Sequence, residues 1–579
     1  MRAESPLSRR SADRRSSSGK HFDDAASAQP QQGSIPDGVI SGGVMSDGQI
    51  VGGVASPVAL SDDLRVDDAR VIPSRTDVVV RDASRVIGGP LGAHGAVGRS
   101  RRWTPIRVLF LLSLCALALS WYGKAGCLQQ APATSEANDA GHAMRLDWDN
   151  QRQFTDLCYS DVIALYGAEQ LDKGAFPYKA SWTQQDQNGN TITRYMEYPV
   201  LTGLYMYVAA QAAQGWQWLH DHLGIPGALS VVLFFDLVAL GLALFWLVVV
   251  WATALTARSR IWAAWLAALS PLVIVHAFTN FDAIAVAMVA VAILAWARNK
   301  PWLAGLFIGL GVASKWYPIL LLFVLLVLCL RARRGNDFFV AASAAVLTWV
   351  VVNLPILLLH PRGWYEFFRY NGQRGADSDS LFRILAKAAD FTWNITLLNA
   401  VSLGLLVLIA CGIGYLALRV PTRPRLAQLA FLMVAGFLLV NKVWSPQYSL
   451  WLVPLAVLAI PHTRLLMTWM VIDALVWIPR MSLFLDPSRR WLPEGWFTLV
   501  VVLRALMVVA LCVVVIWQIY HPEDDLVRRD RRGRPLDDPA GGPLDGAAGG
   551  YPTADPARLG AMPETFGGTG RRVSTSQGA

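Results

Sequence analysis

The sequence predicts an all-α polytopic membrane protein with about twelve transmembrane helices and a large, partly helical external first loop. Of its 579 residues, 54% are hydrophobic and only 16% are charged, and the mean hydropathy is +0.37. A soluble chain with this balance would expose too much apolar surface. Long apolar segments alternate with short polar or basic ones, which is typical of a chain that crosses a bilayer repeatedly.

The apolar segments lie between residues 103 and 520. They are 106–122, 229–257, 261–277, 281–297, 302–313, 316–330, 339–360, 394–418, 426–440, 447–461, 463–480 and 497–519. Several are shorter than the ~20 residues that span a bilayer alone, so we expect them to include flanking residues or to be partly re-entrant.

A further candidate, Leu201 to Leu219, carries Gln211, Gln214 and Gln217 at intervals of three residues. This spacing gives a helix a polar stripe, which suits a helix at the membrane interface better than one that crosses the lipid.

The basic loops favour the same choice. If 201–219 does not cross, the arginine-rich loops near residues 258, 298, 331 and 419 all fall in the cytoplasm together with both termini, as the positive-inside rule requires. The sequence therefore predicts a multi-pass plasma membrane protein with external loops. These are 124–228, 278–280, 314–315, 361–393, 441–446 and 481–496.

Both ends of the chain read as disordered cytoplasmic tails, at 1–102 and 521–579, because they are polar, rich in Gly, Ser, Asp and Arg and without helical or strand periodicity. A regulatory or partner-binding role for a tail is the alternative. The basic residues fall in the tails and in short loops, so they indicate topology and not nucleic-acid binding.

Six cysteines are too few for a disulfide scaffold. Cys127 and Cys158 both fall in the large external loop, where oxidation is favoured. They either form a disulfide or remain free thiols. The other four lie within apolar segments, where packing accounts for them.

Polar residues that topology does not explain gather on the external side. They are Asp161 and Glu197 in the first loop, Asn280 and Asp282, Lys315 to Tyr317, Arg369, Tyr370, Arg374 and Arg383, and the run Asn441 to Tyr448. Lys315 and Lys442 lie between apolar helices, where an unpaired charge is costly, so we expect an anion near them. A lipid phosphate that arrives from the membrane is one such anion.

One carboxylate with nearby cations and aromatic rings suits sugar transfer from a lipid-linked phosphate. A base removes the proton of the acceptor hydroxyl, and cations hold the departing phosphate. A phosphate leaves without a general acid, so one carboxylate suffices, unlike the pair that glycoside hydrolysis requires.

Several motifs resemble those of glycosyltransferase family 87. They are Cys158-Tyr-Ser-Asp161, Glu197-Tyr-Pro199, Phe281-Asp-Ala283, Ala304-Gly305 to Pro318, and Ser445-Pro-Gln-Tyr-Ser-Leu-Trp451. The resemblance covers roughly 103–520 and implies a GT-C-like transmembrane domain of the kind found in polyprenyl-phosphate-mannose-dependent α-mannosyltransferases of actinobacteria. It also implies inverting transfer at the outer, periplasmic face with Asp161 as the base.

The candidate donor- or substrate-binding residues are Glu197, Tyr198, Asp282, Lys315, Lys442, Gln447 and Tyr448. Each has a simpler reading too. Asp161 or Asp282 could cap a helix, Glu197 could belong to a surface ion pair, and the lysines could extend to the interface. Gln447 and Tyr448 could serve helix packing alone.

Other polar or small residues within the apolar segments have structural readings. Gly305, Gly309 and Gly311 indicate close helix packing rather than a phosphate loop. Asp236 and Asp473 lie in apolar segments, and Arg504 could pair with one of them. No metal ligand set is visible, so we expect no metal and no cofactor other than the donor, although a divalent ion could assist the phosphate.

The sequence thus predicts a cell-envelope glycosyltransferase that moves mannose from a polyprenyl-phosphate donor to a glycolipid or polysaccharide among the membrane lipids. A lipid-linked arabinofuranose is the alternative donor. A transporter or lipid flippase, and a scaffold acting through its tails, are the alternatives of other classes. The absence of a visible internal repeat disfavours the transporter.

Overall fold

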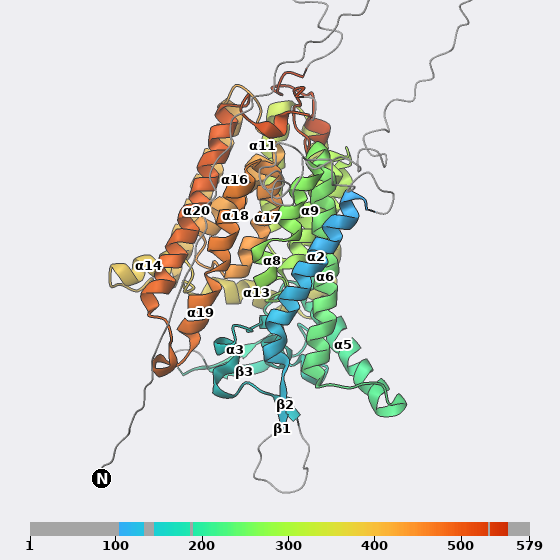
Figure 1. Ribbon diagram of the computed structural model, residues 1–579, viewed down its shortest axis with the longest axis vertical. Helices are drawn as coiled ribbons and strands as arrows, with labels where there is room; N and C mark the ends of the chain where they lie inside the picture. The colour runs from blue at the N-terminus through green and yellow to red at the C-terminus, as the bar shows by residue number, and fades with distance from the viewer. Residues whose placement is uncertain (1–102, 133–143, 186–188, 531–532, 554–579) are drawn as a thin grey trace, which may run out of the picture. The chain divides into compact units, whose positions relative to one another are not determined.

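The computed structural model describes residues 103–132, 144–185, 189–530 and 533–553. The predicted N-terminal tail, 1–102, and the part of the C-terminal tail after residue 553 lie outside these ranges. The described chain is mostly helical, with short strands in the first loop alone among the described residues (Figure 1). The expectation of a predominantly α-helical membrane protein is confirmed.

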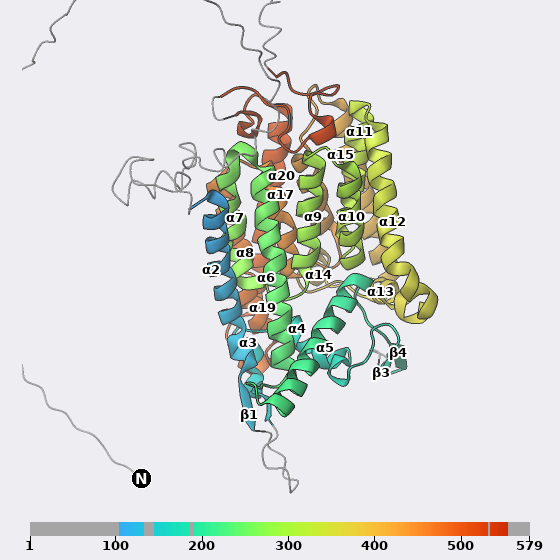
Figure 2. The same ribbon diagram turned by 90° about the vertical axis from the view of Figure 1, so that its right-hand side faces the viewer.

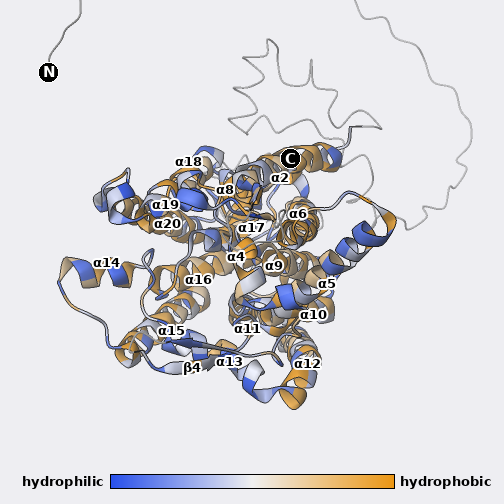
Figure 3. Ribbon diagram, turned by 90° about the horizontal axis from the view of Figure 1, so that it is seen from below, coloured by the Kyte–Doolittle hydropathy of each residue, from blue (hydrophilic) through white to orange (hydrophobic). Residues whose placement is uncertain are grey.

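Six helical segments in the described part are long and apolar enough to cross a membrane. They are α2 (Pro105–Ala125, continued to Leu128), α6 (Ser230–Thr256), α12 (Gly335–Leu359), α15 (Ile395–Arg419), α18 with α19 (Thr463–Ala474 and Trp477–Phe484) and α20 (Glu494–Tyr520). Hydrophobic residues predominate in the helical bundle when it is seen from below (Figure 3), as expected of helices surrounded by lipid and other helices.

Shorter apolar helices pack among the long ones. They are α7 (Trp265–Ala268), α8 (Pro271–His276), α9 (Asp282–Ala297), α10 (Pro301–Ser314), α11 (Leu320–Ala332), α16 (Leu426–Val440) and α17 (Leu452–Ala459). The apolar segments seen in the sequence are thus mostly helical, although some, such as 261–277, are divided into shorter helices. Because several are short, about twelve crossings stays a prediction.

The first loop carries a small layer of mixed structure at one end of the bundle (Figures 1 and 2). Its helices are α3 (Arg152–Thr155), α4 (Asp161–Ala168) and α5 (Val200–Leu223). Two antiparallel hairpins pair β1 (Gln130–Pro132) with β2 (Met144–Leu146), and β3 (Trp182–Gln185) with β4 (Thr191–Arg194). The sequence predicted the helices of this loop but not its strands.

Helix α5 includes the segment with the glutamine stripe. It is not among the segments that meet the length and hydropathy of a membrane span within the described chain. It lies with α4 at the lower end of the bundle in Figure 2, beside the lower part of α6. Two further helices, α13 (Pro361–Gln373) and α14 (Leu381–Ala388), lie at this same end, and α14 shows both hydropathic colours in Figure 3, as expected of helices at an interface.

The predicted disorder from residue 521 does not hold for the described residues of this segment. Arg425 and Asp525 form an ion pair at 2.7 Å in which both side chains are at most 1% exposed, and Arg423 pairs equally deeply with Asp537. The Trp296 indole donates to the Gly541 carbonyl oxygen at 2.9 Å. Composition misled here because the charges of this segment have buried partners on the helical bundle, and composition does not show such pairing.

Basic loops gather at the end of the bundle that also binds the C-terminal segment. Arg258 donates to the Ala297 carbonyl, Arg331 to the Pro421 carbonyl, and Arg423 to the Ala548 carbonyl. The first loop lies at the opposite end (Figure 1). The prediction that the basic end is cytoplasmic rests on the positive-inside rule and stays a prediction.

Close packing of α10 on α12 depends on two glycines. A Cβ on Gly305 would lie 2.0 Å from the Ala341 carbonyl oxygen, and one on Gly309 would lie 2.5 Å from that of Ala345. The interpretation of these glycines as helix-packing residues is confirmed.

We expect Gly305→Ala to destabilise the protein by about 1–3 kcal/mol, because the methyl group would force α10 away from α12. Gly404→Ala on α15 is the matched control, since a Cβ there meets no atom within 4 Å. The measurement is the midpoint of thermal unfolding in detergent. Equal midpoints for the two variants would contradict the packing role of Gly305.

Candidate active site

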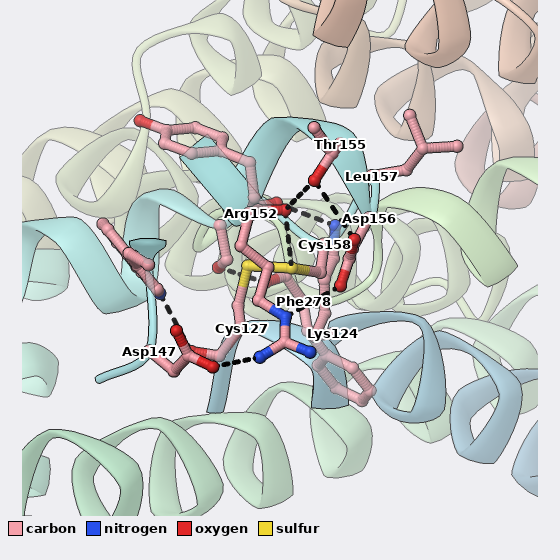
Figure 4. The surroundings of a disulfide bond; sticks show 12 residues. Lys124, Cys127, Asp147, Arg152, Thr155, Asp156, Leu157, Cys158 and Phe278 are labelled. Atoms are coloured by element: carbon pink, nitrogen blue, oxygen red, sulfur yellow. Dashed lines mark hydrogen bonds and ion pairs between the residues drawn. A yellow bond between two sulfur atoms is a disulfide. The ribbon is translucent and has the colours of Figure 1, made fainter. Parts of the chain in front are cut away.

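The site begins with the tether that holds the residues before Asp161. Cys127 and Cys158 form a disulfide with a Cα–Cα distance of 5.5 Å (Figure 4). The Lys124 amine donates to the Tyr159 carbonyl oxygen at 2.9 Å and lies 4.6 Å from the ring centroid of Trp477. The disulfide and the lysine thus attach residues 158 and 159 to the end of α2.

A serine, not Asp161, caps helix α4. The Ser160 hydroxyl accepts from the Val162 N–H at 3.2 Å and donates to the Phe278 carbonyl at 2.6 Å. Asp161 is the first residue of α4, and its backbone N–H donates to the Thr279 carbonyl at 2.9 Å. The alternative in which Asp161 serves as the cap is therefore wrong, and its carboxylate is free for another role.

Two amide side chains converge on one oxygen of the Asp161 carboxylate. Asn280 donates to Oδ2 at 2.7 Å, and Gln447 donates to the same atom at 3.4 Å. The Asn280 amide oxygen accepts from the Phe281 N–H at 2.6 Å, so its NH₂ group must face Asp161. The same NH₂ group lies 2.9 Å from the Tyr198 hydroxyl.

The Tyr159 hydroxyl also bonds to the Asp161 carboxylate. Burial, followed by the charge of Asp161 and this hydrogen bond, raises the pKa of Tyr159. The phenol therefore stays protonated and donates to the carboxylate. Asn280, Gln447 and Tyr159 thus all direct hydrogen-bond donors at this carboxylate.

A second carboxylate has a cationic partner. The Lys315 amine lies 2.8 Å from Oδ1 of Asp282, which also accepts from the Trp451 indole at 2.7 Å. Asp282 is 1% exposed. A lysine and an indole therefore neutralise and bind this buried carboxylate, which gives Asp282 a structural role. Asp161, in contrast, accepts from neutral amide groups.

Three stacked rings extend from this ion pair. Tyr448 stacks on Trp451 at 4.3 Å between centroids, and Trp451 stacks on Tyr317 at 4.2 Å. The Lys315 amine lies 4.8 Å from the Tyr448 centroid. The motif around residues 445–451 thus contributes a ring stack beside Lys315 and an amide donor to Asp161.

Glu197 interacts electrostatically with both Asp161 and Arg374. Burial is the largest effect and raises the pKa of Glu197, the cation of Arg374 opposes it, and the charge of Asp161 adds to it. The Tyr370 hydroxyl donates to the Glu197 carboxylate. This residue therefore faces the site and is not part of a surface ion pair.

Lys442 does not meet an anion among the described residues. Its amine lies 2.7 Å from the Asn371 carbonyl, 2.6 Å from the Arg374 carbonyl and 2.6 Å from Oδ1 of Asn399. Three neutral oxygens thus take the three protons that an ammonium group can donate. The amine thus has protein partners without an anion, and a phosphate beside this lysine stays a prediction.

The buried charges of the apolar segments have separate partners. Asp236 accepts from the Trp121 indole at 2.9 Å, and Asp473 from the Trp469 indole at 3.1 Å. The Arg504 guanidinium lies 4.0 Å from the Trp444 ring centroid and donates to the Asp379 carbonyl. Within the described part of the chain, neither aspartate forms a direct ion pair with Arg504, so the expected pair is not formed.

The structure brings Asp161, Tyr198, Gln447 and Asn280 together, with Asp282, Lys315 and Tyr448 beside them. Sequence reasoning noted Asn280 as an unexplained polar residue but did not assign it to the site. Its position directly before Phe281-Asp282 was the available signal. The described residues contain no group of three or more His, Cys, Asp or Glu side chains able to hold a metal.

We expect the Cys127→Ser/Cys158→Ser double variant to be less stable by about 2–4 kcal/mol, because the disulfide closes a loop with a sequence separation of 31 residues. Transfer activity should fall as well, since residue 158 loses its tether three positions before Asp161. Thermal unfolding and activity, each compared with Cys115→Ser in α2, measure the effect. Unchanged values for both would contradict this role.

Comparison with known families connects this geometry to a chemistry. Residues 198–441 match the model of glycosyltransferase family 87. The match contains Asn280, Asp282 and Lys315, and it confirms the resemblance seen in the sequence. It indicates glycosyltransferase activity in a membrane protein. No curated protein matches the chain.

Proposed function

We propose that this protein, part of which matches the model of glycosyltransferase family 87, transfers a sugar, mannose in the first instance, from a polyprenyl-phosphate donor to an outer-face glycolipid or polysaccharide. One observation carries the proposal. Asp161 receives hydrogen bonds from Asn280 and Gln447 on one oxygen, at the end of the bundle opposite the basic loops (Figure 1).

The proposed step is a single inverting displacement. The acceptor hydroxyl oxygen attacks the anomeric carbon while Asp161 takes the hydroxyl proton. The bond between the anomeric carbon and the phosphate oxygen breaks, and its electron pair leaves with the phosphate. A cation near the departing oxygen stabilises the charge that develops there.

The residues around Asp161 have separate roles in this step. Asn280 and Gln447 hold Oδ2, which leaves Oδ1 to receive the proton. Lys315 and the rings of Tyr448 and Trp451 form the neighbouring wall, where aromatic faces suit the apolar faces of a sugar. Glu197 and Tyr198 face the same space and would position hydroxyl groups.

The test is transfer of labelled mannose from polyprenyl-phosphate-mannose to endogenous lipids, in membranes with and without the protein. A lipid product that requires the protein supports the proposal. If a product forms only when the donor is a lipid-linked arabinofuranose, the proposed sugar is wrong and the proposed mechanism stands. Movement of the labelled lipid across proteoliposomes without a covalent product would replace the transferase by a transporter.

A further inference from the structure

The loop from Asn371 to Ser380 connects Lys442 to the site. The Lys442 amine holds the carbonyl oxygens of Asn371 and Arg374, and the Lys442 carbonyl accepts from the Asp377 N–H at 2.9 Å. The Ser445 hydroxyl lies 3.3 Å from the Asp377 carboxylate. Four contacts thus fix this loop to residues 442–445, directly before Gln447 and Tyr448.

The loop presents one arginine to the site. The Arg374 guanidinium lies near the Tyr448 ring and near Glu197, with the Asp377 carboxylate 3.8 Å away and the Tyr370 centroid 5.9 Å away. Its side chain is 33% exposed, so it remains open to solvent while surrounded on several sides. The long distance to Asp377 leaves donors of the guanidinium available for another acceptor.

Arg374 and Lys315 flank the same ring. Lys315 lies 4.8 Å from the Tyr448 centroid, and both cations act electrostatically on Tyr448. Lys315 already has Asp282 as a partner at 2.8 Å, whereas the nearest ion pair of Arg374 is longer by 1.0 Å. The less neutralised cation beside Tyr448 is therefore Arg374.

The pKa values of Lys442 and Arg374 also favour Arg374 as the charged group. Burial and the neighbouring Arg374 lower the pKa of Lys442 to about 8. Burial also acts to lower the pKa of Arg374, but the neighbouring Tyr448, Asp377, Tyr370 and Glu197 together raise it by more, so its guanidinium stays charged. A planar guanidinium also matches the geometry of phosphate oxygens better than an ammonium group.

We infer that Arg374 binds the phosphodiester of the lipid donor, and the phosphate monoester that the transfer leaves, beside Lys315, and that Lys442 is a positioning residue that fixes the Arg374 loop. This inference rests on the proposed function and replaces Lys442 by Arg374 as the second phosphate-binding cation. Arg374 would stabilise the phosphate oxygen that receives the electron pair when the sugar leaves.

The experiment measures binding of polyprenyl monophosphate to the purified full-length protein in nanodiscs, by ligand-induced shifts in thermal unfolding. Arg374→Gln should weaken binding about tenfold or more, which is the usual effect of losing a charge-assisted hydrogen bond. Arg383→Gln, an exposed arginine on α14, is the matched control and should bind as the wild type does. Polyprenol without phosphate should bind the wild type and Arg374→Gln alike, and inorganic phosphate tests whether the lipid chain is needed.

Lys442→Met tests the positioning role. It should weaken phosphate binding less than Arg374→Gln, because it acts through the loop. A larger loss in Lys442→Met would place the Lys442 amine on the phosphate and overturn the assignment. Equal binding by Arg374→Gln and the wild type would overturn the inference alone, whereas no binding by the wild type would overturn the proposed donor class with it.

Discussion

Asp161→Asn is expected to lower the rate of sugar transfer by about 10²–10⁴-fold, the range typical of losing a general base. The asparagine has the shape of the aspartate, and its side-chain oxygen can still accept from Asn280. The variant should therefore fold normally and bind the donor, with the loss in kcat. The measurement is initial transfer rate at saturating donor, with thermal unfolding in parallel.

Asp172→Asn is the matched control for this experiment, because Asp172 is an exposed carboxylate in the same loop. It should transfer sugar at the wild-type rate. A wild-type rate for Asp161→Asn would exclude this carboxylate as the base. The role would then pass to Glu197, the other carboxylate that faces Asp161.

Local patterns in the sequence identified the parts of the site that depend on single motifs. These parts are Asp161, Lys315 and the run from Ser445 to Tyr448. All of them lie at the end of the bundle opposite the basic loops, which the sequence predicts to be external. Helix positions followed from hydropathy, since nearly every apolar segment is helical. These features depend on composition over short windows, which the sequence displays directly.

Features that depend on pairing between distant segments could not be read from one sequence. Asn280 contacts Asp161 across 119 positions, and Lys442 contacts Asn371 across 71. Because Lys442 lies between apolar segments, the sequence correctly predicted that its amine has a partner. The sequence could not show whether that partner is a phosphate or three carbonyl and amide oxygens. Likewise, the charges at Asp525 and Asp537 resemble those of a solvated tail until their arginine partners are known.

The C-terminal segment makes the largest stability prediction. Arg425 contacts Asp525 through two nitrogens, at 2.7 and 3.2 Å, and its guanidinium also donates to the Leu458 and Ala459 carbonyls. Arg425→Met would leave the buried Asp525 carboxylate without its close cation, since the other one, Arg528, lies 3.9 Å away. We expect the free energy of unfolding to fall by about 3–5 kcal/mol, the usual result of removing one member of a buried pair.

Lys387→Met is the matched control, because it removes a lysine from the exposed pair Lys387–Glu494, also at 2.7 Å. That pair should contribute at most about 1 kcal/mol. Thermal unfolding in detergent compares the two variants, and an equal, small shift for both would contradict a structural role for the C-terminal segment. Asp525→Leu added to Arg425→Met should recover part of the loss, since no unpaired buried charge remains.

The same variant should also lower transfer activity, although Arg425 lies at the opposite end of the bundle from Asp161. Helix α16 begins directly after Arg425 and leads to the residues before Gln447, and Arg425 also binds the carbonyls at the end of α17. Helix α9 begins at Asp282 and ends beside Trp296, which donates to Gly541. The C-terminal segment thus holds the far ends of the helices that carry the site. Loss of stability with full activity at low temperature would show that these helices keep their positions without it.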